Sequence, residues 1–124
     1  MSNIGNIALY FIFIRDQVKL YHWTTKNFAR HTASDQFVNN LSTKMDKFIE
    51  VMQGSENKRL VLPKQMIEYS ISNDKSIIML LNDFKRWLEN KLPEMLNPKN
   101  TELLNIRDDI LADVQQTLYL FTFQ

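Results

Sequence analysis

Residues that break helices are scarce in this 124-residue chain, and their scarcity constrains the fold more than any other feature of the sequence. Only two glycines and three prolines are present, and these are the residues that most often mark turns and interrupt regular structure. Long uninterrupted segments lie between them, in which apolar residues recur at steps of three and four. This pattern predicts an all-α fold for a single domain over residues 1–124.

The apolar pattern predicts four helices, over residues 6–25, 28–53, 74–91 and 101–121. Gly54 would end the second helix and Pro93 the third. The weakly patterned segment 55–73 is long enough to return the chain along the whole bundle. We therefore expect a ferritin-like arrangement, a four-helix bundle with a long crossover between its second and third helices. The core stripes expected on the second and fourth helices are Phe37, Leu41, Met45, Phe48, Met52, Leu103, Ile106, Ile110, Val114, Thr117 and Phe121.

Composition excludes several classes of function. The chain has a formal charge of +1 and no cysteine, so it lacks both a basic surface for DNA and any thiolate metal site, disulfide or cysteine nucleophile. The apolar run 7–14 is far shorter than the ~20 residues that span a bilayer, and nothing near it resembles a signal peptide. We expect a cytoplasmic protein that binds neither DNA nor membranes.

Both histidines of the chain lie close together in sequence, and three carboxylates follow them. The histidines are His22 and His31, and the carboxylates are Asp35, Asp46 and Glu50. On a helix with ~100° per residue, the last four of these fall at roughly 0°, 40°, 60° and 100°, so they share one stripe. Imidazole and carboxylate groups with open positions suit Fe(II) or another divalent metal. The pattern therefore favours a metal site.

One copy of the second helix cannot close a single site from both ends of this stripe. His31 and Asp46 lie about 22 Å apart along a helix, whereas each ligand of a metal lies ~2.0–2.2 Å from it. Two antiparallel copies related by a two-fold axis between Val38 and Asn39 would bring His31 of one level with Asp46 of the other. The spacing therefore predicts a homo-oligomer with sites at antiparallel contacts of the second helix.

Each of these residues also has a purely structural interpretation. His22 could be a hydrogen-bonded histidine at the edge of the core, and Asp46 and Glu50 could be solvated carboxylates beside lysines. Asp35 could cap the start of the second helix. A metal at this place could also be a structural clamp, and a redox-inert ion such as Zn(II) would then bind without turnover.

The same residues resemble the ferroxidase signature of the Dps mini-ferritins. The shared features are His-Trp near the end of a first helix, a second histidine with Asp four residues on, and then Asp and Glu four residues apart. The shorter form HW-x-TK-x-[FY]-A-x-H, at residues 22–31, is closer to an uncharacterised ferritin-like family of phages and large viruses. That family also carries D-x-x-x-E-x-x-x-G, met by Asp46, Glu50 and Gly54, and T-L-Y-L, met by residues 117–120.

The resemblance implies a ferritin-like protein that binds iron between two-fold-related subunits, as a dimer or a Dps-like cage. His22 and His31 would supply nitrogen from one subunit and Asp46 and Glu50 oxygen from its mate, and these are the candidate catalytic residues. Asp35 would support them or bind a second iron. The activity implied is oxidation of Fe(II) to Fe(III) by peroxide or oxygen, in iron storage or oxidative-stress protection. The alternative is a viral or phage helical bundle that retains the fold and acts as a non-enzymatic assembly or interaction protein.

Overall fold

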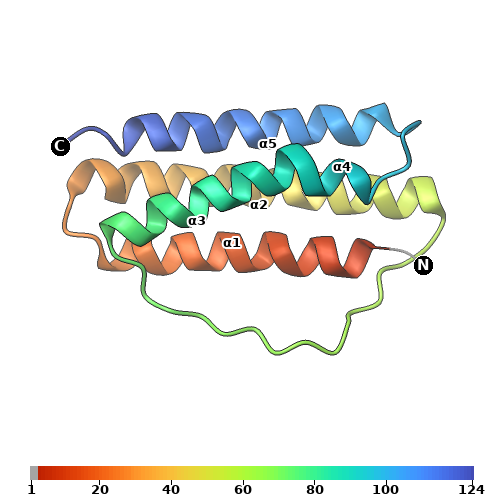
Figure 1. Ribbon diagram of the computed structural model, residues 1–124, viewed down its shortest axis with the longest axis horizontal. Helices are drawn as coiled ribbons and strands as arrows, with labels where there is room; N and C mark the ends of the chain where they lie inside the picture. Colours follow the sequence, from red (N-terminus) through yellow and green to blue (C-terminus); the bar gives the residue numbers. More distant parts are fainter. Residues whose placement is uncertain (1–2) are drawn as a thin grey trace.

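The computed structural model describes residues 3–124, and within this range the chain forms helices and loops and no β-strand. The same residues make four long helical segments that pack as a bundle (Figure 1). The segments are α1 (Ile4–Thr24), α2 (Phe28–Glu56), α3 (Asp74–Arg86) continued by the π-helical turn η1 (Trp87–Lys91) and α4 (Leu92–Glu94), and α5 (Thr101–Leu120). The prediction of an all-α bundle is confirmed. Each helix in this range is too short or too polar to cross a bilayer.

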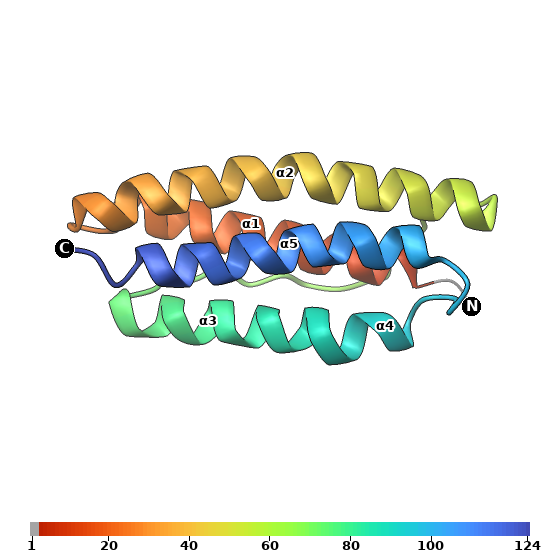
Figure 2. The same cartoon turned by 90° about the horizontal axis from the view of Figure 1, so that it is seen from above.

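Neighbouring helices alternate in direction except where a long connection intervenes. α1 and α2 run antiparallel, and α3 and α5 also run antiparallel, whereas α2 and α3 run parallel (Figures 1 and 2). α2 packs against both α1 and α5, and α3 packs against α5 and α1. The connection 57–73 therefore carries the chain back from the end of the bundle where α2 stops to the end where α3 starts.

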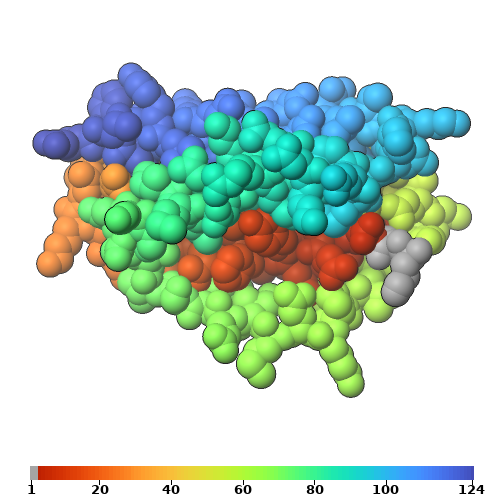
Figure 3. Space-filling view, viewed as in Figure 1, coloured from red at the N-terminus to blue at the C-terminus, as the bar shows by residue number. Residues whose placement is uncertain are grey.

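The connection 57–73 lies along α1 and runs in the same direction. Near its start, the Val61 backbone packs so closely on Gly5 that a β-carbon on Gly5 would lie 2.1 Å from the Val61 carbonyl oxygen. Near its end, Ser70 donates its backbone N–H to Gln17 Oε1 at 3.0 Å. In the space-filling view the connection forms one edge of the molecule below α1, with side chains that project outward (Figure 3).

The apolar stripes expected in the core are buried. They comprise Phe37, Leu41, Met45, Phe48 and Met52 of α2, and Leu103, Ile106, Ile110, Val114, Thr117 and Phe121 at α5. Aromatic rings from different helices meet edge to face at the centre, where the Phe11 ring lies 5.4 Å from Phe48 and 6.2 Å from Phe84 between centroids. Such pairs add to the stabilisation from burial itself. The predicted core faces of α2 and α5 are confirmed.

The end of α2 differs from the prediction, because the helix stops at Asn57 and not at Gly54. Gly54 lies within α2 with an ordinary helical backbone, so its tolerance of positive φ is not used. Asn57 adopts the left-handed conformation, with φ 51° and ψ 46°, which asparagine accepts more readily than most residues. Its N–H bonds to the carbonyls of Gln53 and Gly54 and so closes the last turn.

The third helix, which was predicted to end before Pro93, instead continues to Glu94, and it widens into η1 just before the proline. Proline has no N–H, so it leaves a carbonyl of the preceding turn without its usual partner. In η1 the Leu92 N–H bonds to the Trp87 carbonyl. The freed Leu88 carbonyl accepts a hydrogen bond from Arg107 Nη1 of α5 at 2.9 Å. The helix then continues through the short α4.

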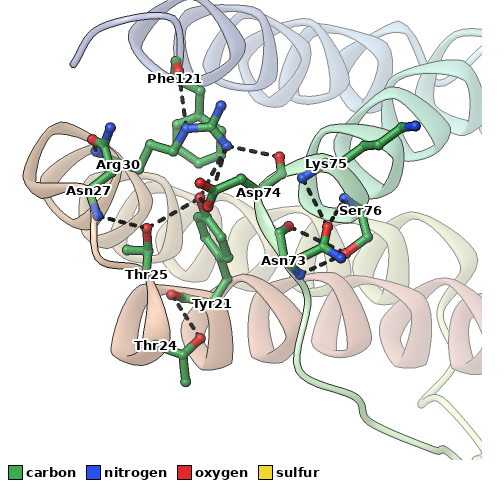
Figure 4. A network of polar contacts seen from close by, with 10 residues as sticks. All are labelled: Tyr21, Thr24, Thr25, Asn27, Arg30, Asn73, Asp74, Lys75, Ser76 and Phe121. Atoms are coloured by element: carbon green, nitrogen blue, oxygen red, sulfur yellow. Dashed lines mark hydrogen bonds and ion pairs between the residues drawn. The ribbon is translucent and has the colours of Figure 1, made fainter.

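A network of polar contacts joins α1, α2, α3 and α5 at the end of the bundle where α1 turns into α2 (Figure 4). The Tyr21 hydroxyl donates to Asp74 Oδ1 at 2.6 Å and accepts from Arg30 Nη1 at 3.1 Å. Arg30 also donates to the backbone carbonyls of Asp74 at 2.9 Å and Phe121 at 3.1 Å. Tyr21 and Arg30 directly precede the two histidines, so the network fixes the backbone from which those side chains extend.

Candidate functional site

The two histidines meet at the turn between α1 and α2. His22 lies in the last turn of α1 and is buried, whereas His31 lies in the first turns of α2 and is exposed. Their rings stack, with centroids 4.0 Å apart and planes 16° from parallel. Asn27 starts α2 by accepting a hydrogen bond from the Arg30 N–H at 2.9 Å. This cap fixes the start of α2 and therefore the position of the His31 ring beside the His22 ring.

Each histidine donates a hydrogen bond to the backbone of the other. Nδ1 of His22 lies 2.7 Å from the His31 carbonyl oxygen, and Nδ1 of His31 lies 2.9 Å from the His22 carbonyl oxygen. A carbonyl oxygen only accepts, so each Nδ1 carries a hydrogen. The Ser34 hydroxyl is consistent with this tautomer, because it donates to the His31 carbonyl at 3.1 Å and lies 3.3 Å from His22 Nδ1. In the neutral rings the lone pair is then on Nε2, as a metal-binding imidazole requires.

Asp35 is the carboxylate that lies beside His22. Its Oδ1 atom lies 3.7 Å from His22 Nε2 and 3.5 Å from Lys19 Nζ. The Lys19 ammonium also lies 5.7 Å from the centre of the Trp23 ring, within the range of a cation–π contact. The N-cap of α2 is Asn27, so the alternative interpretation of Asp35 as that cap does not hold.

Asp46 and Glu50 lie on the same helix as Asp35 but far from the histidines. Both are exposed, and both border a surface hollow between α1 and α2. Because α2 is continuous over Phe28–Glu56, His31 and Asp46 are separated by about 22 Å along its axis. A single chain therefore brings His22 together with His31 and with Asp35, and leaves the other two carboxylates apart.

Within one chain, the candidate metal ligands meet as pairs. Among residues 3–124, no three side chains of histidine, aspartate or glutamate come close enough together to hold one ion. The stacked histidines cannot share an ion, since imidazole binds a metal in its own ring plane and nearly parallel planes do not meet between the rings. His22 Nε2 and Asp35 Oδ1 lie 3.7 Å apart. That separation is close to the about 3.4 Å between two ligands of a tetrahedral ion with bonds of about 2.1 Å.

The Tyr21 hydroxyl next to this site has a raised pKa. Burial is the main cause, because it disfavours the phenolate, and the hydrogen bond to Asp74 acts in the same direction. Thr25 and Arg30 lower the pKa and offset part of the rise. Tyr21 therefore keeps its proton at neutral pH and holds the turn by donating to one partner and accepting from another.

Sequence reasoning missed Lys19 and the reciprocal bonds of the histidines. Lys19 lies three residues before His22 and four before Trp23, the spacings at which side chains meet on a helix. The spacing alone could therefore have predicted that Lys19 lies close to His22 and Trp23. The bonds between the histidine rings and backbone carbonyls had no signal in the sequence, because they depend on how closely α1 and α2 approach at the turn.

Comparison with known proteins places the chain in a family. No curated protein and no solved structure matches it. One family model matches residues 22–121, a range that begins at the first histidine and includes His31 and all three carboxylates of the candidate site. The match covers most of the chain, and the chain belongs to the family of unknown function DUF5856.

Proposed function

We propose that the protein is a ferritin-like, Dps-type iron-binding protein that oxidises Fe(II) with peroxide or oxygen at sites between two-fold-related subunits. The observation that carries this proposal is the state of His22. Its Nδ1–H bond to a carbonyl leaves a lone pair on Nε2, and the Asp35 carboxylate lies 3.7 Å from that nitrogen. Two acceptor atoms, His22 Nε2 and Asp35 Oδ1, approach each other here, and this arrangement favours a cation. An imidazole and a carboxylate together suit Fe(II).

The topology of the bundle supports the ferritin-like part of the proposal. The parallel course of α2 and α3, joined by the long connection 57–73 (Figure 1), is the arrangement of bundles with one full-length crossover, to which ferritins belong. The chain contains no E-x-x-H motif, so the di-iron site that such bundles build within one subunit is absent. Iron chemistry is then expected at the subunit interface.

The proposed interface binds two ions in each site. His22 and Asp35 would bind one, and His31 would bind the other with Asp46 and Glu50 of the partner subunit. This division follows from the stacked rings, which cannot share an ion. It also follows from the uninterrupted course of α2, since a two-fold axis midway between His31 and Asp46 brings each level with the other in an antiparallel pair.

The proposed reaction transfers one electron from each of two Fe(II) ions to one molecule of hydrogen peroxide. The O–O bond breaks, two hydroxide ions form and both ions become Fe(III), so atoms and electrons balance. Iron is the substrate in this scheme. The carboxylates offset part of its charge, and the small number of protein ligands leaves coordination positions open for the oxidant.

Anaerobic titration with Fe(II) tests iron binding, and light scattering of the same sample reports the mass of the assembly. We expect saturable binding of about one to two ions per subunit in an assembly larger than a monomer, and fast oxidation when peroxide is added. A monomer whose iron binding does not exceed that of ordinary surface carboxylates would refute the proposal.

Mixing two variants tests whether subunits share the site. His31→Ala and Asp46→Ala each remove one half of every site, so each alone should abolish binding of the ion held by these residues. After subunit exchange in an equimolar mixture, each mixed dimer regains one intact site, which restores about one quarter of all sites. Asp109→Ala, at an exposed carboxylate of α5, is the matched control and should bind iron normally. Exchange without recovery would show that the ligands do not come from two subunits.

A second candidate function is that of a non-enzymatic viral or phage assembly or interaction protein. Apolar side chains on the connection favour it, since Val61 and Met66 are 82% and 85% exposed, and gathered apolar residues mark interaction surfaces. This alternative predicts that His31→Ala changes neither the oligomeric state nor the stability, and that metals bind with ordinary surface affinity. The iron titration decides between the two functions.

A further inference from the structure

The Asp35 carboxylate, which the proposed function assigns to a metal ion, already has a cation beside it. Lys19 Nζ lies 3.5 Å from Asp35 Oδ1, and this is the same oxygen atom that lies 3.7 Å from His22 Nε2. A metal ion bound between His22 and Asp35 would use that oxygen atom. The lysine ammonium and the metal ion therefore compete for one ligand.

Lys19 is held in this position weakly. Its side chain is 34% exposed and that of Asp35 is 47% exposed, so water screens the attraction between their charges. The second contact of the ammonium is the face of Trp23, 5.7 Å from the ring centre, and this residue is 66% exposed. An exposed cation–π contact adds little to the ion pair. Both partners can therefore release the lysine without a large change in the fold.

We propose that Lys19 is the built-in counter-cation of the metal-free site and that an incoming divalent ion displaces it from Asp35. This inference rests on the proposed function. In the metal-free protein the ammonium offsets the carboxylate charge beside the His22 lone pair. When a divalent ion binds, repulsion moves the ammonium away from Asp35 and from the Trp23 ring. Lys19 thus lowers the affinity for divalent ions and keeps their binding reversible.

Zn(II) is the probe for this inference, because it is redox-inert and binds nitrogen and oxygen ligands in tetrahedral sites. Titration of the unmodified protein with Zn(II) should shift the fluorescence emission of Trp23. Trp23→Phe should remove this shift, even though Trp87 is still present. Lys19→Met keeps most of the aliphatic stem and removes the charge, so we expect it to bind Zn(II) about tenfold more tightly and to show little emission shift.

Two controls separate displacement of Lys19 from a general effect of charge. Lys26→Met removes the same charge at an exposed position of the turn between α1 and α2, and its Zn(II) affinity should stay within about twofold of the unmodified protein. High salt screens exposed charges, so it should reduce the difference in Zn(II) affinity between Lys19→Met and the unmodified protein. Lys19→Gln provides a second neutral variant in case the methionine variant folds poorly, as judged by circular dichroism.

The outcomes distinguish this inference from the proposed function. If the neutral variants of Lys19 bind Zn(II) no more tightly than the unmodified protein, while that protein binds it saturably, the inference is wrong and the metal site stands. If the unmodified protein binds neither Zn(II) nor Fe(II) above surface affinity, the proposed function and the inference are both wrong. Metal binding by the unmodified protein therefore shows whether the proposed function fails or only the inference about Lys19.

Discussion

Tyr21 donates its phenolic hydrogen to Asp74 at 2.6 Å, across 53 residues of sequence, and this bond joins the end of α1 to the first turn of α3. The same hydroxyl accepts a hydrogen bond from Arg30 of α2 at 3.1 Å. α1, α2 and α3 therefore meet at one oxygen atom. Since Tyr21 precedes His22, the hydrogen bonds of its hydroxyl support both the stability of this end of the bundle and the geometry of the histidine pair.

Tyr21→Phe should lower the free energy of unfolding by about 1–3 kcal/mol, because it leaves the Asp74 carboxylate and the Arg30 guanidinium without their shared partner. Urea denaturation followed by circular dichroism measures this change. Tyr119→Phe is the control, since Tyr119 is 61% exposed, and it should shift the free energy by no more than about 0.5 kcal/mol. Equal effects of the two substitutions would show that the network adds no stability.

The raised pKa of Tyr21 predicts a loss of stability at high pH. The folded protein holds the phenolic proton more tightly than the unfolded chain, in which the pKa is near the ordinary value of 10.0. Below that pH the contribution of Tyr21 to stability is fully present. As pH rises above it, the unfolded chain loses the proton first, so the free energy of unfolding falls until the folded protein also releases it.

Tyr21→Phe should therefore make the decline in unfolding free energy above about pH 10 less steep. Part of the decline should persist, because burial also raises the pKa of Tyr10 and Tyr69. Urea denaturation at a series of pH values measures both slopes. The same slope in the variant and the unmodified protein would contradict the assignment of this pH dependence to Tyr21.

Alanine substitutions at the two glycines should change stability in opposite directions. At Gly5 a β-carbon would lie 2.1 Å from the Val61 carbonyl oxygen, so the backbone of the connection would have to move, at a cost of about 1–3 kcal/mol. At Gly54 no atom outside the adjoining backbone of α2 lies within 4 Å of the added carbon, and alanine in a helix interior stabilises by about 0.5–1 kcal/mol relative to glycine. Thermal or urea denaturation of the two variants measures these changes. If Gly5→Ala left the stability unchanged, the connection would be free to move away from α1.

Arg107→Met should lower the free energy of unfolding by about 1–2 kcal/mol, because the Leu88 carbonyl loses the donor that replaces the missing N–H of Pro93. Pro93→Ala restores an N–H and should recover part of this loss when combined with Arg107→Met. A double-mutant cycle of urea denaturation measures the coupling. Strictly additive effects would show that the arginine bond and the proline are independent.

The helices and their buried faces were predictable from the sequence because both depend on local patterning. The stripe from Phe37 to Met52 on α2 repeats at helical spacing, and that repeat is enough to assign its side to the core. The ends of helices were less predictable. Asn57 and Gly54 can both end a helix, and the choice depends on where the last turn closes. Pro93 stays within the helix because Arg107, a residue of another segment, satisfies the carbonyl that it frees.

The sequence by itself determined that His22, His31 and the three carboxylates lie at the turn and along one side of α2, since residue spacing on a helix sets direction and distance. Only the tertiary structure decided which of them meet. The close approach of α1 and α2 gives each histidine a carbonyl partner on the other helix and leaves Nε2 as the acceptor. It also brings Lys19 to Asp35. These contacts join residues on two different helices, and helical periodicity describes the faces of one helix but not how closely two helices pack.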